Sequence, residues 1–263
     1  MTHWLRTPAG RYLLTWEQEH LDSAVADLFG FHALQVGLPE LDALRANRMP
    51  HRWVGTEGPL SADDPELGDT VPRAAVALHL DYDALPFDTA SLDLVVLPHT
   101  LELAHDPHQT LREVERVLMP EGRVVIVGFN PASLWGLRQR AGRLRAGLAL
   151  GRGRSLFLPS SGEFLGYRRL RDWLRLLSFE VEAGRFGCYR PPVMSEKWLA
   201  RCEWMDHSGE RWWPVFGAVY FVVAVKRVRG MRLVGLVREQ RQFKPAANAV
   251  VTNRHREMEE EVS

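Results

Sequence analysis

The sequence predicts an α/β fold, a doubly wound domain built on a mostly parallel sheet. Residues 92–97 form a short apolar run rich in Val and Leu, which is typical of a strand buried on both faces. Residues 110–118 then place apolar side chains at helical spacing, and residues 124–127 form the next buried strand. A helical crossover between two buried strands implies that these strands are parallel.

The rest of the chain is expected to continue this alternation. In order, the sequence predicts a helix over 10–29, a strand over 33–36, a short helix over 41–46, strands over 53–56 and 74–80, a helix over 168–177, and late strands over 179–182 and 218–226. Residues 58–71, rich in Pro, Gly and Asp, are expected to form a loop. Strands that alternate with helices or loops favour the doubly wound architecture.

The charge of the chain is balanced overall but not locally. The 33 Lys and Arg equal the 33 Asp and Glu, yet residues 1–121 contain 8 basic against 20 acidic residues, so that segment is strongly acidic and the remainder is basic. This asymmetry concerns the partners of the second half rather than its fold. Two cysteines without Cys-x-x-Cys spacing, no signal-peptide pattern and no apolar run of about 20 residues predict a soluble, cytoplasmic protein.

Polar or flexible residues follow the predicted strands, where open parallel sheets bind their ligands. Gly37 follows the first strand, Glu57 the second and Asp81 the third. Gly37 permits a tight turn and close approach of the backbone to a ligand. Glu57 comes about twenty residues after Gly37, which is the spacing at which an acid binds ribose hydroxyls in such folds. A ligand that carries a ribose is therefore predicted at this edge of the sheet.

Three strings within residues 84–131 carry a family resemblance: Ala-Leu-Pro-Phe-Asp, Leu-Asp-Leu-Val-Val-Leu-Pro-His and Leu-Met-Pro-Glu-Gly-Arg-Val-Val-Ile-Val-Gly-Phe-Asn-Pro. Through them, residues 33–131 resemble the cofactor core of the class I S-adenosylmethionine-dependent methyltransferases, particularly the quinone-biosynthesis branch. The fuller string, including 47–50 and 130–137, looks like an uncharacterised bacterial subgroup, and the resemblance extends to about Arg227. It implies methyl transfer, S-adenosyl-L-methionine as cofactor and a final antiparallel strand pair.

The resemblance also implies roles for single residues. Asp81 stands where the family contacts the adenine amino group, and Tyr82 beside it is placed to cover the adenine ring. Pro98 and His99 follow the fourth strand, in the segment that lines the cleft of the family. The predicted cofactor-binding set is Gln35, Gly37, Glu57, Asp81, Tyr82, Pro98 and His99. No metal site is predicted, since Cys188, Cys202 and His207 lack compact ligand spacing.

The chain departs from the family at its glycine loop. The family carries Asp-x-Gly-x-Gly-x-Gly, whereas this chain reads Gln-Val-Gly-Leu-Pro-Glu-Leu over residues 35–41. Pro39 lacks a backbone N–H, and Leu41 is bulky where close packing is usual. The departure leaves open a methyltransferase-like domain that binds a ligand or partner without catalysis. His99 is the candidate general base, because imidazole titrates near neutral pH; the alternative is a cleft-lining or hydrogen-bonded histidine.

The second half adds an arginine-rich segment and a tryptophan-rich one. No acidic residue occurs between Glu121 and Glu163, where Arg138, Arg140, Arg143 and Arg145 alternate with leucines at helical spacing. Such a helix suits an anionic membrane surface or a nucleic acid; the alternative is an ordinary lid helix with solvated arginines. The aromatic residues Trp198, Trp204, Trp212, Trp213 and Phe216 lie where related enzymes form the substrate wall, and a large apolar or aromatic acceptor would suit such a wall. The expected partner is a small-molecule acceptor, either small or apolar or aromatic.

These segments together predict one methyltransferase-like domain over residues 1–227. It consists of an N-terminal helix (1–30), a cofactor-binding core (31–131), a basic lid or insertion (132–165) and the C-terminal part of the sheet with the substrate wall (166–227). Residues 228–263, mixed in charge, are expected to form a flexible tail.

Overall fold

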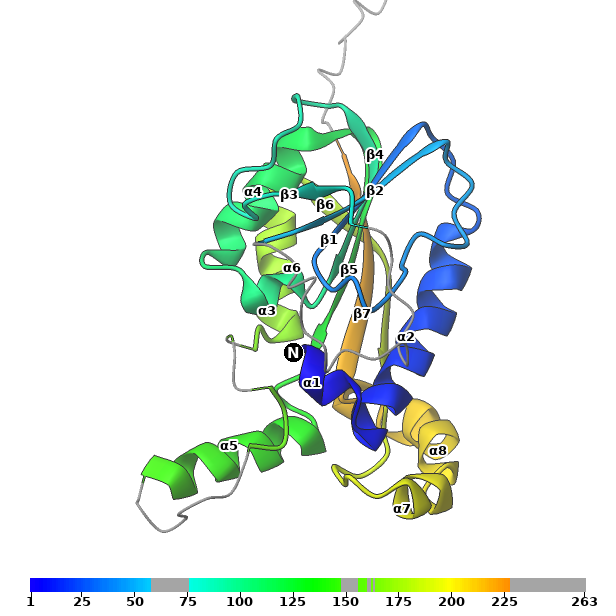
Figure 1. Ribbon diagram of the computed structural model, residues 1–263, viewed down its shortest axis with the longest axis vertical. Helices are drawn as coiled ribbons and strands as arrows, with labels where there is room; N and C mark the ends of the chain where they lie inside the picture. Colours follow the sequence, from blue (N-terminus) through cyan, green and yellow to red (C-terminus); the bar gives the residue numbers. More distant parts are fainter. Residues whose placement is uncertain (58–75, 148–155, 160–161, 163, 228–263) are drawn as a thin grey trace, which may run out of the picture. The chain divides into compact units, whose positions relative to one another are not determined.

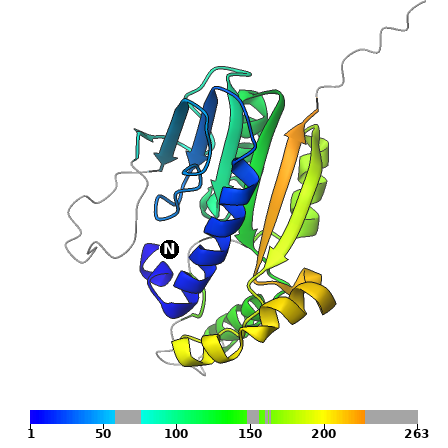
Figure 2. The same ribbon diagram turned by 90° about the vertical axis from the view of Figure 1, so that its right-hand side faces the viewer.

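The computed structural model describes residues 1–57, 76–147, 156–159, 162 and 164–227. Its seven-stranded sheet has the order β3-β2-β1-β4-β5-β7-β6 (Figures 1 and 2). The strands are β1 His32–Val36, β2 His51–Thr56, β3 Leu78–His79, β4 Leu92–Pro98, β5 Leu118–Phe129, β6 Phe179–Gly187 and β7 Val219–Lys226. Strands β1 to β5 are parallel, and β7 is antiparallel to both β5 and β6. The predicted fold class is thereby confirmed, including the late antiparallel pair.

Helices cover both faces of this sheet, with α2 on one face and α4 and α6 on the other (Figure 1). The helices are α1 Thr2–Leu5, α2 Pro8–Val25, α3 Thr100–Leu103, α4 Pro107–Val117, α5 Leu134–Gly147, α6 Tyr167–Leu176, α7 Glu196–Arg201 and α8 Trp204–Trp212, followed by the 3-10 turn η1 Pro214–Phe216. Successive strand residues point to opposite faces, so Val95 packs in the core under α4 and α6, and Val96 packs in the core under α2. None of the helices described here is both long and apolar enough to cross a bilayer.

Some predicted elements differ from the observed ones. Residues 41–46 form consecutive turns instead of a helix, because the side chain of Gln35 takes backbone groups that a helix would need for itself. The third strand is limited to Leu78–His79. The predicted loop over 58–71, residues 74–75 and the tail over 228–263 lie outside the described residues.

Helix α5 exposes leucines that recur at helical spacing among its arginines. Leu134, Leu137 and Leu144 are 49, 53 and 69% exposed, whereas Trp135 and Gln139 are buried. The indole Nε1 of Trp135 donates to the carbonyl of Arg190 at 2.7 Å. Gln139 donates to the carbonyl of residue 158 and accepts from its N–H. The helix is therefore anchored through Trp135 and Gln139, and these three leucines remain about half exposed or more.

Candidate functional site

The carboxyl ends of β1, β2, β3 and β4 lie side by side at one edge of the sheet because these strands are parallel neighbours. Four predicted positions fall at this edge: Gly37 follows β1, Glu57 follows β2, Asp81 follows β3, and Pro98 is the last residue of β4. The chain order reverses between β1 and β4, which is where open α/β sheets form their ligand crevice. The topology therefore gathers the predicted cofactor residues at the expected place.

Gly37 is the point at which three of these strand ends meet. Its φ is +82°, a conformation that glycine adopts without strain, and its N–H donates to the carbonyl of Gly55 at 2.7 Å. A Cβ on residue 37 would lie 3.2 Å from the Thr100 hydroxyl oxygen and 3.2 Å from the Tyr82 hydroxyl oxygen. The absence of a side chain thus leaves two hydroxyl groups facing the backbone at this turn.

The loop that follows Gly37 is organised by the buried side chain of Gln35. Its amide nitrogen lies 3.2, 3.0 and 2.7 Å from the carbonyl oxygens of residues 37, 38 and 41, and its amide oxygen accepts from the N–H of Ala43 at 2.9 Å. These bonds satisfy backbone groups that would otherwise be buried without partners. Gln35 was predicted to bind the cofactor, and the structure gives it a positioning role in the loop.

The conformation of this loop explains how it forms without the later glycines of the family's glycine loop. Leu38, Leu41 and Leu44 are at most 4% exposed and pack in the core cluster under α2. Bulky residues are accommodated because the loop turns its side chains inward, away from the strand edge. Leu38 adopts a positive φ of 39°, which continues the tight turn begun at Gly37.

Glu57 and Asp81 present carboxylates at the same edge. Both side chains are exposed. One oxygen of Asp81 accepts from the N–H of Asp83 at 2.9 Å, and its other oxygen has no hydrogen bond to the described residues. The N–H of Glu57 donates to the hydroxyl of Tyr82 at 3.4 Å, so the ends of β2 and β3 are joined.

Tyr82 contributes its hydroxyl to this edge, while its ring is buried in the core under α4 and α6. Burial raises the pKa of Tyr82, and the charges of Glu57 and Glu40 add to the rise although the N–H of Glu57 opposes it. The hydroxyl therefore stays protonated and can donate to an acceptor beside Gly37. Tyr82 is only 6% exposed, so its ring offers little free surface for the predicted stacking on adenine.

Thr56 adds a polar group that the sequence did not single out. It is the last residue of β2, 5% exposed, and its hydroxyl oxygen is buried with no hydrogen-bond partner among the described residues. A buried hydroxyl without a partner costs free energy unless a ligand or water satisfies it. Together with the carboxylates of Glu57 and Asp81, it makes an edge that fits a ligand with ribose hydroxyls and an amino group.

His99, the predicted general base, is fully buried between two carboxylates. Its Nε2 lies 2.7 Å from Glu17 of α2, and its Nδ1 lies 2.9 Å from Glu102 of α3. The second oxygen of Glu102 accepts from the N–H of Phe129 at the end of β5. His99 itself has a positive φ of 55° and donates its N–H to the carbonyl of Val127 at 2.8 Å.

The charges of this cluster fix the protonation of His99. Burial alone would lower the pKa of the imidazole, but the carboxylates of Glu17 and Glu102 outweigh burial and raise it to about 10. Burial also raises the pKa of Glu102, against the opposing effect of His99. The cluster as a whole thus retains protons, and an imidazolium that donates from both nitrogens favours a positioning role. General-base catalysis by His99 stays a prediction.

Glu17, which the sequence analysis did not single out, has a fully buried side chain. A signal for its burial was present in the sequence. Glu17 lies four residues from both Leu13 and Leu21, so helical spacing places it within the buried stripe of α2. Glu102 lies three residues after His99, and no helical spacing in the sequence predicted its burial.

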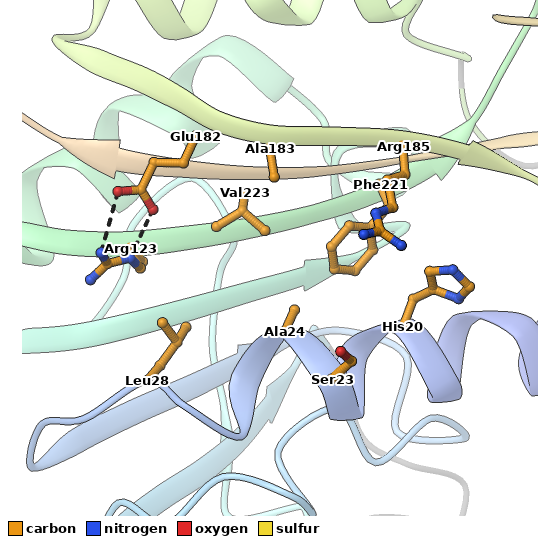
Figure 3. A pocket seen from close by; sticks show the side chains of 10 residues that line it. All are labelled: His20, Ser23, Ala24, Leu28, Arg123, Glu182, Ala183, Arg185, Phe221 and Val223. Carbon is orange, nitrogen blue, oxygen red and sulfur yellow. Dashed lines mark hydrogen bonds and ion pairs between the residues drawn. The ribbon is translucent and has the colours of Figure 1, made fainter. Parts of the chain in front are cut away.

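A groove of about 350 Å³ lies away from this edge, between α2 and the β6–β7 pair (Figure 3). It is lined by His20, Ser23, Ala24, Leu28, Arg123, Glu182, Ala183, Arg185, Phe221 and Val223. Arg123, ion-paired with Glu182 at 2.9 Å, is opposite Leu94 in the register, near the amino end of β4. The groove therefore does not include the strand ends that carry Glu57 and Asp81. Within the described part of the chain, no cluster of His, Cys, Asp and Glu could hold a metal ion.

Comparisons with known proteins find methyltransferases and one uncharacterized relative. Residues 64–126 match a methyltransferase domain family. The uncharacterized protein YafS of Escherichia coli (strain K12) is 31% identical over 229 residues, which cover 85% of this chain and 80% of that protein. A demethylmenaquinone methyltransferase of Chlamydia pneumoniae is 37% identical over 54 residues, 20% of this chain and 24% of that enzyme. The solved structure of a SAM-dependent methyltransferase from Thermotoga maritima covers 83% of this chain and 91% of its own, with a TM-score of 0.53 and 14% identity, a likeness of fold.

We expect Gln35→Leu to destabilise the protein by about 3 kcal/mol or more, because it leaves several buried backbone groups without partners. Urea unfolding followed by tryptophan fluorescence measures this loss. Gln109→Leu is the matched control, since the side chain of Gln109, unlike that of Gln35, makes no hydrogen bond to the described residues. A Gln35→Leu variant as stable as this control would show that the loop does not depend on the amide.

We expect the unfolding free energy to fall as pH rises from 6.5, the ordinary pKa of histidine, towards about 10, the raised pKa of His99 in the fold. The stabilisation is fully present below the pKa of histidine in the unfolded chain, and it is lost as pH rises through the pKa of His99 in the fold. It amounts to roughly a few kcal/mol. Urea unfolding across this pH range measures the fall, and NMR of the imidazole reports the titration itself.

Glu17→Gln removes one carboxylate and should move both the fall in stability and the imidazole titration to lower pH. The exposed Glu19 of the same helix provides the control Glu19→Gln. Identical pH profiles for Glu17→Gln and the wild-type protein would contradict the charge pairing of His99.

Proposed function

The chain belongs to the class I S-adenosylmethionine-dependent methyltransferases, and we propose that it methylates a small, apolar or aromatic acceptor with this cofactor. The observation that carries the proposal is the polar edge at the ends of β1, β2 and β3. There, the tight turn at Gly37, the exposed carboxylates of Glu57 and Asp81 and the hydroxyl of Thr56, which has no partner among the described residues, adjoin one another in the topology.

Each part of this edge suits one part of the cofactor. The carboxylate of Glu57 can accept from two adjacent ribose hydroxyls, and the free oxygen of Asp81 can accept from the adenine amino group. Gly37 is buried, and its missing side chain leaves the hydroxyls of Thr100 and Tyr82 beside the backbone turn. When bound, the cofactor supplies an electrophilic methyl group on a sulfonium.

The chain itself must then orient donor and acceptor. Correct orientation of two reactants lowers a barrier substantially without a dedicated acid or base. The His99 cluster contributes to this task indirectly, because it fixes the end of β4 beside Thr100 and Gly37. We infer that His99 acts as a positioning residue for the site.

The apolar nature of the acceptor is supported by two observations. Exposed tryptophans lie on α7 and α8, which lead into β7 from the carboxyl end of the sheet. In addition, one relative is a demethylmenaquinone methyltransferase, which favours the quinone-biosynthesis branch and an acceptor of that chemistry. The two cysteines are free, which suits the cytoplasm as its compartment.

A second candidate function is ligand binding without catalysis. It is motivated by the loop after β1, in which Leu38 and Leu41 point inward and Pro39 offers no N–H to a ligand. This candidate shares the cofactor edge with the first one. The two differ in a single result, because a binding protein holds the cofactor but releases no methylated product from any cell extract.

We expect S-adenosylhomocysteine to bind the wild-type protein, and Glu57→Ala and Asp81→Ala each to weaken binding by about tenfold or more, since hydrogen bonds to charged groups contribute about 1.5–3 kcal/mol. Calorimetric titration measures the affinity, and urea unfolding checks that both variants are folded.

Glu19→Ala removes an exposed carboxylate of α2, outside the strand edge, and should leave the affinity unchanged. Undiminished binding by a folded Asp81→Ala variant would refute the assignment of the adenine site. Methyl transfer from a labelled donor into the lipid-soluble rather than the aqueous fraction of an extract is the expected sign of an apolar acceptor.

A further inference from the structure

A cluster of exposed tryptophans distinguishes the segment between β6 and β7. Trp198, Trp204, Trp212 and Trp213 are 57, 61, 70 and 52% exposed, and Val215 and Phe216 beside them are 54 and 52% exposed. We call these six residues the aromatic surface. Single exposed apolar residues are ordinary, but large aromatic side chains gathered on successive short helices mark an interaction site.

The aromatic surface is exposed on a well-anchored scaffold. The carboxylate of Asp206 in α8 accepts from the Tyr12 hydroxyl, from the N–H of Tyr189 at 3.0 Å and from Arg190 at 2.8 Å. A Cβ on Gly209 would lie 2.3 Å from the ring of Tyr189, so α8 packs directly on this ring. Trp204 and Trp212 are therefore exposed on a helix whose opposite side is held by hydrogen bonds and packing.

Helix α5 extends this surface with positive charge and leucines. It is joined to the segment before α7, because Trp135 donates to the carbonyl of Arg190 and Arg138 donates to the carbonyl of Pro192. Both views of the fold place α5 at the same end of the molecule as α7 and α8 (Figures 1 and 2). Arg138, Arg140 and Arg143 are exposed, as are the leucines at 134, 137 and 144. Arg145 belongs to the same helix, but its side chain lies outside the described part.

This combination matches the surface of an anionic bilayer. Tryptophan has an apolar ring and a polar N–H and concentrates at membrane interfaces, while arginine packs its stem against apolar groups and keeps its charge near lipid phosphates. No acidic residue occurs in α5 to oppose this attraction. A nucleic acid would use the arginines and stack on the tryptophans, but it would leave the exposed leucines and Val215 in water.

We propose that the aromatic surface and α5 together form a docking site for an anionic lipid bilayer. The helices lie on the membrane plane, with the tryptophans and leucines inserted at headgroup depth and the arginines paired with lipid phosphates. The inference goes beyond methyl transfer and does not require it.

The docking surface adjoins the catalytic end of the sheet. Strand β5 ends at Phe129 shortly before α5 begins, and Phe129 pairs with Val219, where β7 begins just after η1. Both helical segments therefore lie at the carboxyl end of the parallel strands, the end that carries Gly37, Glu57 and Asp81. If the proposed function holds, a lipid-soluble acceptor reaches the site from the bilayer.

The test is co-sedimentation of the full chain with vesicles of mixed phosphatidylglycerol and phosphatidylcholine, compared with vesicles of phosphatidylcholine alone. We expect binding to the anionic vesicles, weakened by salt, with a blue shift of tryptophan emission. Trp204→Ala with Trp212→Ala should weaken partitioning by about tenfold or more through lost apolar contact. Arg140→Gln with Arg143→Gln should weaken it by a similar factor and reduce its salt dependence.

Matched controls lie away from the docking surface. Phe29 and Phe31 are 78 and 68% exposed beside the amino end of β1, so Phe29→Ala with Phe31→Ala removes exposed aromatic area elsewhere. Arg112→Gln with Arg175→Gln removes charge from α4 and α6. Neither pair should change partitioning, and calorimetry with S-adenosylhomocysteine should give the wild-type affinity for all variants, which separates this proposal from the proposed function.

Three outcomes would overturn the proposal. The first is equal, weak sedimentation with both kinds of vesicle. The second is binding of a single-stranded oligonucleotide that competes with vesicles and depends on the arginines but not on the tryptophans. The third is a wild-type dimer in sedimentation velocity that becomes monomeric in Trp204→Ala with Trp212→Ala, because the surface would then join two copies of the chain.

Discussion

The buried pairing of His99 with Glu17 and Glu102 is the interaction on which the carboxyl end of the sheet depends. It joins three elements that are distant in sequence, since Glu17 belongs to α2 and Glu102 also holds the N–H of Phe129 in β5. Burying charges costs several kcal/mol per ion and is repaid only by close geometry with all partners present. The cluster therefore fixes the arrangement of these strand ends. It thereby also positions Thr100, whose hydroxyl donates to the carbonyl of Val36.

The loop after β1 reaches a stable turn by a route that differs from a glycine-rich one. A glycine-rich loop followed by a helix leaves N–H groups free for a ligand. Here, Gln35 bonds to the N–H of Ala43 and to several carbonyls, and Leu38 and Leu41 anchor the turn in the core. Fewer backbone donors remain for a ligand at this loop, so the cofactor site that we propose depends mainly on the carboxylates that follow β2 and β3. The site thus relies on side-chain charge where a glycine loop would rely on backbone dipoles.

The sheet was predictable because its signals are local: apolar runs, helical spacing between them, and crossovers that imply parallel pairing. The same logic places Gly37, Glu57 and Asp81 at one edge, because residues that follow parallel strands share an edge. The absence of a helix over 41–46 was not predictable, since it depends on one side chain bonding to backbone several residues away. The partners of His99 were hidden for a related reason, as Glu17 lies 82 positions earlier in the chain.

The topology determines where the acidic and the basic parts of the sequence lie on the sheet. The acidic first part, residues 1–121, supplies the carboxylates of the cofactor edge and of the His99 cluster, whereas the basic second part contains α5. Because β7 is antiparallel and begins where β5 ends, the helices of the second part return to the same end of the sheet as the cofactor edge. A chain with separated charge is oriented by an anionic surface before contact, since one part is attracted and the other repelled. In the proposed docking, α5 and the aromatic surface reach the lipid first, and the cofactor edge lies beside them at the same end of the sheet.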